Sequence, residues 1–226
     1  MQKAIIYAVH GFFGCAADWD ALKNSIPDFN FVAEDLFSHQ PKIGTSSFAN
    51  ANRKKIFLGY SLGGRLGLRL LSENPKQFDH YIFLSTHPGL SDQQSKNLRI
   101  ESDEKWADKI NYENWPELQK SWNAQPVFAG SGSEPVRDVA RYDLKKLKLA
   151  LGEWSLGRQN DYSELIREHN QKITWVVGER DSKFCAIASD LENKKILSGY
   201  ERISSGHRIW LDQPIAIANI IKKITQ

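Results

Sequence analysis

A serine flanked by glycines, at the end of a strand-like run, is the feature that most constrains this chain. Residues 56–64 read I-F-L-G-Y-S-L-G-G, which contains the pattern G-x-S-x-G, and a helix-like stretch follows over 65–71. This strand–turn–helix context predicts a nucleophile elbow, a tight turn that projects the Ser61 hydroxyl above a sheet. Gly59 and Gly63 have no Cβ, so the backbone can pass close on either side of the turn.

The rest of the chain favours an α/β fold. Strand-like runs recur at residues 4–9, 29–33, 55–58, 80–84, 173–177 and 196–203, and helix-like or polar stretches separate most of them. This alternation predicts a mostly parallel sheet flanked by helices on both faces.

The alternation breaks between residue 85 and about residue 153. Charged amphipathic stretches there carry Trp106, Trp115 and Trp122. We predict a helical cap, residues 87–153, inserted between two strands of a core domain made of residues 1–86 and 154–226. Residues 129–136 read A-G-S-G-S-E-P-V, which is typical of a flexible turn.

Composition excludes several classes of protein. The formal net charge of +3 is spread without a basic block, so a nucleic-acid partner is not indicated. No apolar run reaches membrane-spanning length, and residues 4–9 already form a strand-like run, so we expect neither a membrane partner nor a signal peptide. Cys15 and Cys185 lie far apart and outside any metal-ligand spacing, which favours a reduced, cytoplasmic protein.

A serine hydroxyl becomes reactive when a histidine takes its proton and a carboxylate orients that histidine. Two later segments supply these groups: W-V-V-G-E-R-D ends at Asp181 beyond one strand, and S-S-G-H ends at His207 beyond the next. The order serine, acid, histidine is the one found with nucleophile elbows. We therefore predict a catalytic triad of Ser61, Asp181 and His207.

The first strand predicts an oxyanion hole. Residues 9–14 read V-H-G-F-F-G, an H-G-x turn that can supply the backbone N–H of Phe12. Leu62, the residue after the nucleophile, can supply a second N–H. For His10 we favour a structural role, in which the imidazole holds this turn by hydrogen bonds.

Together these residues resemble the α/β-hydrolase superfamily. Three further strings narrow the resemblance: H-P-G-L at 87–90, W-N-A-Q-P-V-F at 122–128 and G-E-R-D-S-K-F at 178–184. Over residues 9–207 the chain is similar to the 2-succinyl-6-hydroxy-2,4-cyclohexadiene-1-carboxylate synthases of menaquinone biosynthesis.

The resemblance implies a lyase that needs neither metal nor organic cofactor. Such an enzyme removes pyruvate from 2-succinyl-5-enolpyruvyl-6-hydroxy-3-cyclohexene-1-carboxylate. Ser61, paired with His207, would act as a base on the proton next to the succinyl ketone. The N–H groups of Phe12 and Leu62 would stabilise the charge on the ketone oxygen.

The resemblance also implies a small anionic substrate with three carboxylates, which needs several cations. Arginine suits this role because its planar guanidinium binds a carboxylate through two hydrogen bonds. The candidate substrate-binding residues are Arg65, Arg99, Arg141 and Lys183, with Tyr60 as a polar contact and Trp122 as an apolar wall. His87 is expected to shape the turn before Pro88.

The chain departs from the family after the second strand. The family's D-x-P-G-H-G loop is replaced by D-L-F-S-H-Q-P at 35–41, and residues 46–52 leave room for only a brief helix.

Two alternatives remain open at this stage. The same triad can hydrolyse an ester, a thioester or a carbon–carbon bond through an acyl-enzyme, since fold does not fix function. The chain can also be a binding protein with this fold and no catalysis, a reading that the intact triad disfavours.

Overall fold

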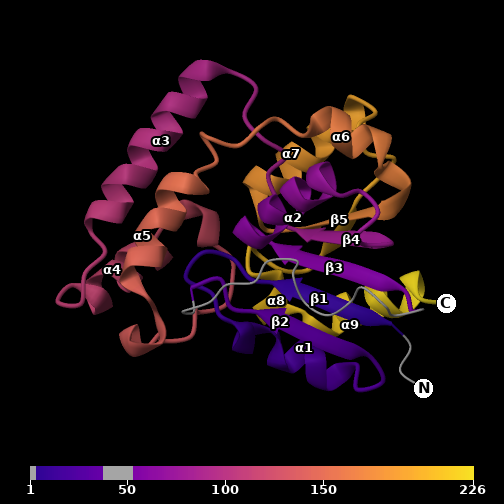
Figure 1. The fold of residues 1–226 in the computed structure, drawn as a ribbon, viewed down its shortest axis with the longest axis horizontal. Helices are drawn as coiled ribbons and strands as arrows, with labels where there is room; N and C mark the ends of the chain where they lie inside the picture. Colours follow the sequence, from indigo (N-terminus) through magenta and orange to yellow (C-terminus); the bar gives the residue numbers. More distant parts are fainter. Residues whose placement is uncertain (1–3, 38–52) are drawn as a thin grey trace.

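A computed structural model describes residues 4–37 and 53–226 of the chain, and Figure 1 presents its fold. The brief helix expected over residues 46–52 lies outside the described residues.

The described strands form one six-stranded parallel sheet. Their order across the sheet is β2-β1-β3-β4-β5-β6, and each neighbouring pair is parallel. The strands are β1 (Ile5–Val9), β2 (Asn30–Glu34), β3 (Lys55–Tyr60), β4 (His80–Leu84), β5 (Ile173–Gly178) and β6 (Glu201–Ile203). The predicted parallel sheet is confirmed, and its geometry brings the carboxyl ends of all these strands to the same edge.

Helices cover both faces of the sheet, because alternate strand residues point to opposite sides. In β1, Tyr7 and Val9 enter one buried cluster, whereas Ile6 and Ala8 enter the other. Figure 1 displays the two layers of helices on either side of the sheet. One face packs on α2 (Leu62–Glu73) and α7 (Ser182–Asn193), and the other on η1 (Ala16–Trp19), α1 (Asp20–Ser25), α8 (Ile209–Asp212) and α9 (Pro214–Ile224).

The last strand is shorter than the sequence indicated. The expected run over 196–203 forms a strand only at Glu201–Ile203. Lys195 adopts a left-handed φ of 56°, and the amides of Ile196 and Leu197 both donate to Leu191 O at the end of α7. The two apolar side chains are buried in the core beside the helix instead of in the sheet. The prediction was wrong here because apolar character marks burial and not a particular secondary structure.

A mainly helical segment separates β4 from β5. It contains α3 (Gln93–Asp108), α4 (Trp115–Asn123), η2 (Pro126–Phe128), η3 (Val139–Arg141), α5 (Leu144–Glu153), α6 (Ser163–Glu168) and η4 (Asn170–Lys172). Helices α3, α4 and α5 lie together to one side of the sheet in Figure 1, and α3 contacts α5. The division into a core and a cap at residues 87 and 153 stays a prediction.

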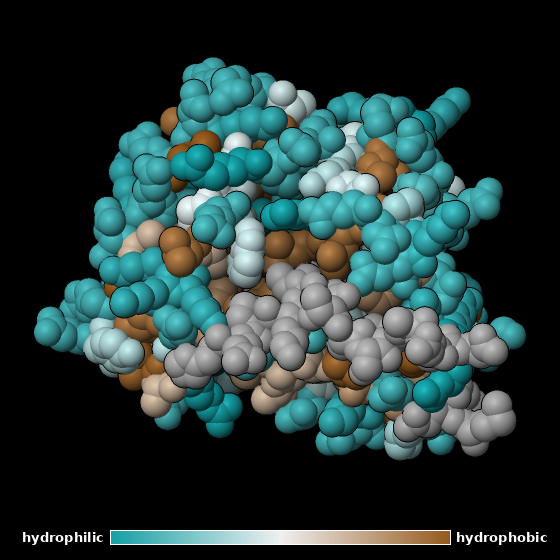
Figure 2. All heavy atoms as spheres, viewed as in Figure 1, coloured by the Kyte–Doolittle hydropathy of each residue, from teal (hydrophilic) through white to brown (hydrophobic). Residues whose placement is uncertain are grey.

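The face of the molecule in Figure 2 is mainly hydrophilic. Among residues 4–37 and 53–226, no helix is both long enough and apolar enough to span a bilayer.

The centre of the sheet is where truncation is expected to cost most stability. Ile82 in β4 is 0% exposed, so Ile82→Ala should lower the free energy of unfolding by roughly 2–5 kcal/mol through lost burial and an empty cavity. Ile215 in α9 is 58% exposed, so Ile215→Ala should change it by no more than about 0.5 kcal/mol. Urea denaturation of both variants tests this, and equal midpoints would contradict the assignment of Ile82 to the core.

Candidate active site

Ser61 lies at a strained turn between β3 and α2. Its backbone has φ 50° and ψ −108°, a conformation that a residue with a side chain rarely adopts. The Ser61 amide donates to Leu84 O at 2.9 Å, and its carbonyl accepts from the Arg65 amide at 3.1 Å. These bonds attach the turn to β4 on one side and to α2 on the other, so the hydroxyl is held at the start of the helix.

The two glycines of the motif are required by close backbone contacts. A Cβ on Gly59 would lie 2.6 Å from Gly64 Cα, and a Cβ on Gly63 would lie 2.1 Å from Val9 O. No side chain fits at either distance. The backbone of the turn therefore lies in close contact with α2 and with β1, as the motif predicted.

The structure brings Ser61, His207 and Asp181 together. The Nδ1 atom of His207 lies 2.6 Å from Asp181 Oδ2, and Nε2 lies 3.3 Å from Ser61 Oγ. Because a carboxylate can only accept, Nδ1 carries the proton and Nε2 is free to accept the serine proton. Asp181 Oδ1 also accepts from the Phe184 amide at the start of α7, which fixes the carboxylate.

The histidine is in its neutral form at neutral pH. Burial is the largest influence and lowers the pKa of His207, while Asp181 opposes it by a hydrogen bond and by its charge. A neutral imidazole between a carboxylate and a hydroxyl can act as a general base.

The two predicted oxyanion donors lie beside Ser61. Gly11–Gly14 forms a turn closed by a hydrogen bond from the Gly14 amide to Gly11 O, with Phe13 strained at φ 60°. Within the described residues, the amides of Phe12 and Leu62 donate to no other group, and both residues line the cavity at Ser61. His10 holds this turn, since Nδ1 lies 2.7 Å from Gly11 O and Nε2 accepts from the Leu36 amide at 3.0 Å.

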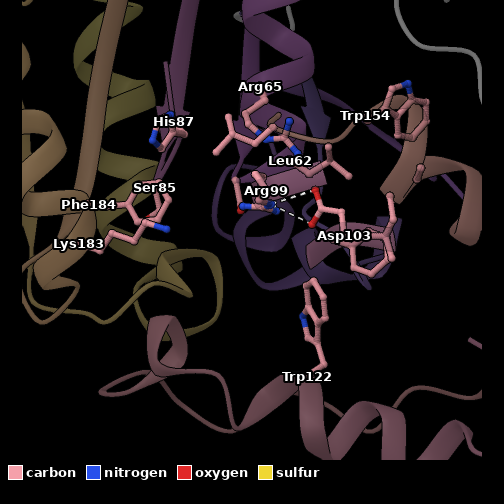
Figure 3. Close-up of a pocket in the computed structure, with 15 residues that line it drawn as sticks. Leu62, Arg65, Ser85, His87, Arg99, Asp103, Trp122, Trp154, Lys183 and Phe184 are labelled. Carbon is pink, nitrogen blue, oxygen red and sulfur yellow. Dashed lines mark hydrogen bonds and ion pairs between the residues drawn. The ribbon is translucent and has the colours of Figure 1, made fainter. Parts of the chain in front are cut away.

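Two hollows both include Ser61 in their linings, and Figure 3 shows the smaller one, which we call the inner recess to distinguish it from the larger outer cavity. The inner recess has a volume of about 90 Å³ and is lined by Arg65, Ser85 and His87 in addition to the residues of the oxyanion turn. The outer cavity has a volume of about 340 Å³ and includes Trp106 and Phe128. Both hollows contain Ser61, Arg99, Asp103, Trp122, Lys183 and Phe184.

Three cations line the inner recess, with one carboxylate among its lining residues. Arg99 Nε lies 2.9 Å from both oxygens of Asp103, a pair drawn with dashed lines in Figure 3. Arg65 donates to Gln159 Oε1 at 3.1 Å, and neither Arg65 nor Lys183 forms an ion pair within the described residues. The recess therefore carries positive charge that the described carboxylates leave uncompensated.

The same crowding of charge alters the acidity of the cations. Burial, followed by the charge of Arg99, lowers the pKa of Arg65 to about 9. Burial and Arg99 likewise lower the pKa of Lys183. Arg65 remains protonated at neutral pH, and the charged forms of both groups would be stabilised by an anion placed between them.

Two predicted substrate-binding residues do not line these hollows. Tyr60 is buried on the opposite face of the sheet, where its ring centroid lies 5.4 Å from that of His207. Arg141 is exposed and lines a separate surface depression. The chain turns Arg141 outward because the next residue, Tyr142, is buried and donates to Phe13 O at 2.7 Å.

The sequence prediction also missed several lining residues. Ser85, Asp103 and Phe184 were not predicted to line the site, and His87 was expected to be structural. The His87 ring does accept from the Gly89 amide at 3.1 Å, yet it also faces the recess. Ser85 directly follows β4, so its position at the carboxyl end of a strand was an available signal.

The turn over residues 129–136 is fastened to the triad loops, contrary to the expectation of flexibility. Arg180, the residue before the triad aspartate, donates to Gly130 O at 3.0 Å. Arg208, the residue after the triad histidine, donates from its backbone to Ser131 Oγ at 3.1 Å. The helical segment thus helps to fix both loops.

Within residues 4–37 and 53–226, no group of three or more His, Cys, Asp or Glu side chains is arranged to hold a metal ion.

Comparison with known proteins agrees with this architecture, although no protein-family model matches the chain. A 2-succinyl-6-hydroxy-2,4-cyclohexadiene-1-carboxylate synthase of Enterobacter sp. (strain 638) is 28% identical over 235 residues, covering 96% of this chain and 89% of that protein. The synthase of the same name from Citrobacter koseri is 28% identical, with 96% and 91% covered.

Solved structures give the fold. The structure of MenH from S. aureus superimposes with a TM-score of 0.80 at 18% identity, covering 99% of this chain and 93% of that one. A thermophilic esterase from Thermogutta terrifontis gives a TM-score of 0.71 at 14% identity, with 98% and 89% covered.

The chain is therefore an α/β-hydrolase-fold protein with its serine, histidine and aspartate in hydrogen-bonding positions. Within that fold, its sequence resembles the 2-succinyl-6-hydroxy-2,4-cyclohexadiene-1-carboxylate synthases.

Reactivity of Ser61 should follow the protonation of His207. The neutral ring takes the serine proton, so labelling by a serine-directed fluorophosphonate should slow as pH falls through the pKa of His207, which lies below the usual 6.5. Mass spectrometry of the labelled protein across pH 4.5–8 measures this. Asp181→Asn should slow labelling at pH 7.5 by about 100-fold or more, because Nδ1 loses its carboxylate acceptor.

Two controls accompany that measurement. Ser61→Ala should not be labelled at all, whereas Cys185→Ser should be labelled as fast as the parent protein. A rate that is flat with pH, or equal in Asp181→Asn, would contradict the triad.

Proposed function

We propose that this protein is a lyase that eliminates pyruvate from 2-succinyl-5-enolpyruvyl-6-hydroxy-3-cyclohexene-1-carboxylate in menaquinone biosynthesis. The observation that carries the proposal is the excess of cations beside Ser61: Arg65, Arg99 and Lys183 share the recess with Asp103. A polycarboxylate matches that charge, whereas a neutral lipid ester does not. The relatives that bear this enzyme's name support the same substrate.

The reaction begins with removal of a proton. His207 takes the Ser61 proton, and the serine oxygen removes the acidic proton next to the succinyl ketone. Negative charge moves to the ketone oxygen, where the amides of Phe12 and Leu62 can donate hydrogen bonds. The N-terminus of α2 adds a partial positive charge at the same point.

Elimination then follows without a covalent intermediate. The enolate collapses through the ring double bond, the bond between the ring carbon and the enolpyruvyl oxygen breaks, and the pair of electrons leaves with that oxygen. The leaving enolate gains a proton and becomes pyruvate. Because electrons are only redistributed within the substrate, the proposal needs no metal or organic cofactor.

The walls of the site suit a ring that carries anionic arms. Trp122 lines both hollows, and its ring centroid lies 4.8 Å from that of Phe12 and 5.0 Å from that of Trp106. These rings offer an apolar surface for the cyclohexene. The substrate carboxylates would then lie against the cations.

We also place the enzyme in the cytoplasm, where a small soluble metabolite is available.

Hydrolysis is the second candidate function. The Ser61–His207–Asp181 arrangement is also that of enzymes which form an acyl-enzyme, and an esterase and a thioesterase domain share the fold. In that case the substrate would be a small anionic ester or thioester, since the cations of the recess remain.

Pyruvate release separates the two functions. The purified protein is mixed with substrate generated by the preceding pathway enzyme, and pyruvate is followed with lactate dehydrogenase. We expect fast release with the parent protein, and with Ser61→Ala a rate equal to the spontaneous breakdown of the substrate. Equal rates for both proteins, with hydrolysis of activated esters by the parent, would contradict the lyase and favour the hydrolase.

Arg99 should contribute mainly to binding. If Arg99 alone were replaced, Asp103 would be left as an unpaired buried carboxylate. The test therefore compares the single variant Asp103→Asn with the double variant that carries both Asp103→Asn and Arg99→Met. Loss of a charged hydrogen bond costs roughly 1.5–3 kcal/mol, so KM should rise by about 10- to 150-fold with a smaller change in kcat. Steady-state kinetics measure this, with Arg141→Ala as a control that leaves KM unchanged; equal KM values for the two test variants would remove Arg99 from the binding site.

A further inference from the structure

Ser85 is a buried polar residue that no part of the described chain satisfies. Its side chain is 0% exposed, and its Oγ has no hydrogen-bond partner among the described residues. A buried hydroxyl without a partner costs stability, so such groups point to a missing ligand or water. The residue lines the inner recess beside Ser61, and Figure 3 shows it next to His87 and Lys183.

The backbone at Ser85 is strained in a way that holds the hydroxyl in place. Its φ of 44° lies in the left-handed region, and its amide donates to Val176 O in β5 at 2.9 Å. The residue is thus anchored to the neighbouring strand in a conformation that would suit glycine better. Strain at such a position is typical of binding and catalytic sites.

His87 presents a second donor to the same recess. Its Nδ1 accepts from the Gly89 amide, so the proton of the neutral ring lies on Nε2. Burial, followed by the charges of Lys183, Arg65 and Arg99, lowers the pKa of His87 to about 4, which keeps the ring neutral. Among the described residues, Nε2 has no hydrogen-bond partner.

The recess is therefore lined by residues that can donate hydrogen bonds. Ser85, His87 and Lys183 all line it, and they carry a hydroxyl, an Nε2–H and an ammonium group. A carboxylate can accept from all three and carries the charge that pairs with the Lys183 ammonium, whereas a neutral amide or hydroxyl carries no such charge. A water molecule needs roughly 10–15 Å³, so the volume of about 90 Å³ admits a group of several atoms.

We propose that Ser85 and His87 are specificity-determining residues, which together with Lys183 bind one carboxylate arm of the substrate in the inner recess. This inference rests on the proposed anionic substrate and adds the residues that select it. It assigns to His87 a binding role in addition to shaping the turn.

Calorimetric titration with succinate tests the proposal without the reaction itself. Succinate is a short dicarboxylate, and succinamide is its neutral counterpart of the same shape. We expect the parent protein to bind succinate and to bind succinamide far more weakly. Ser85→Ala and Ser85→Gly should each weaken succinate binding by about tenfold, the effect of one hydrogen bond to a charged group.

Two features of the variants keep the result interpretable. Ser85→Gly relieves the left-handed strain, so it should fold even if Ser85→Ala does not, and thermal unfolding checks both. Ser91→Ala removes an exposed serine of the same loop that does not line the recess, so it should bind succinate as the parent does.

Each outcome decides the proposal. Equal affinity for succinate in the parent and both Ser85 variants, or no succinate binding by the parent at millimolar concentration, would overturn it and leave a buried water as the partner of Ser85. Ser85-dependent binding in a protein that releases no pyruvate would refute the lyase function and keep the carboxylate recess.

Discussion

The site depends on positive charge that is not matched by an equal negative charge. Arg65, Arg99 and Lys183 line one recess, and Asp103 is the one carboxylate among its described lining residues. Lys183 is exposed and the two arginines are partly exposed, so water screens their mutual repulsion in the free protein. In the proposed function, an anionic substrate supplies the missing charge beside Ser61.

The parallel sheet explains how these groups come together. Phe12, Ser61, Ser85, Asp181 and His207 each follow a strand, and parallel strands end at one edge of the sheet. The strain at the elbow and at Ser85 is sustained by hydrogen bonds to adjacent strands. The helical segment between β4 and β5 contributes Arg99 and Trp122 to the lining of the recess. Its turn over residues 129–136 forms hydrogen bonds with the loops that carry Asp181 and His207.

Local patterns were enough to predict the parallel sheet, the placement of the triad and the positions of Phe12 and Leu62. Properties that depend on distant partners were not predictable in this way. Arg141 faces outward because Tyr142 bonds to Phe13, 129 positions away. The lack of a described hydrogen-bond partner for Ser85 Oγ and the hydrogen bonds that hold residues 129–136 also depend on three-dimensional packing. The amino-acid composition of a turn does not predict either one.

A crystal structure of the Ser61→Ala protein with the cyclohexadiene product bound would test the central claim most directly. We expect carboxylate oxygens within hydrogen-bond distance of Arg65, Arg99 or Lys183, and the ketone oxygen between the amides of Phe12 and Leu62. Ordered product with its carboxylates in solvent, or bound in the surface depression at Arg141, would contradict it.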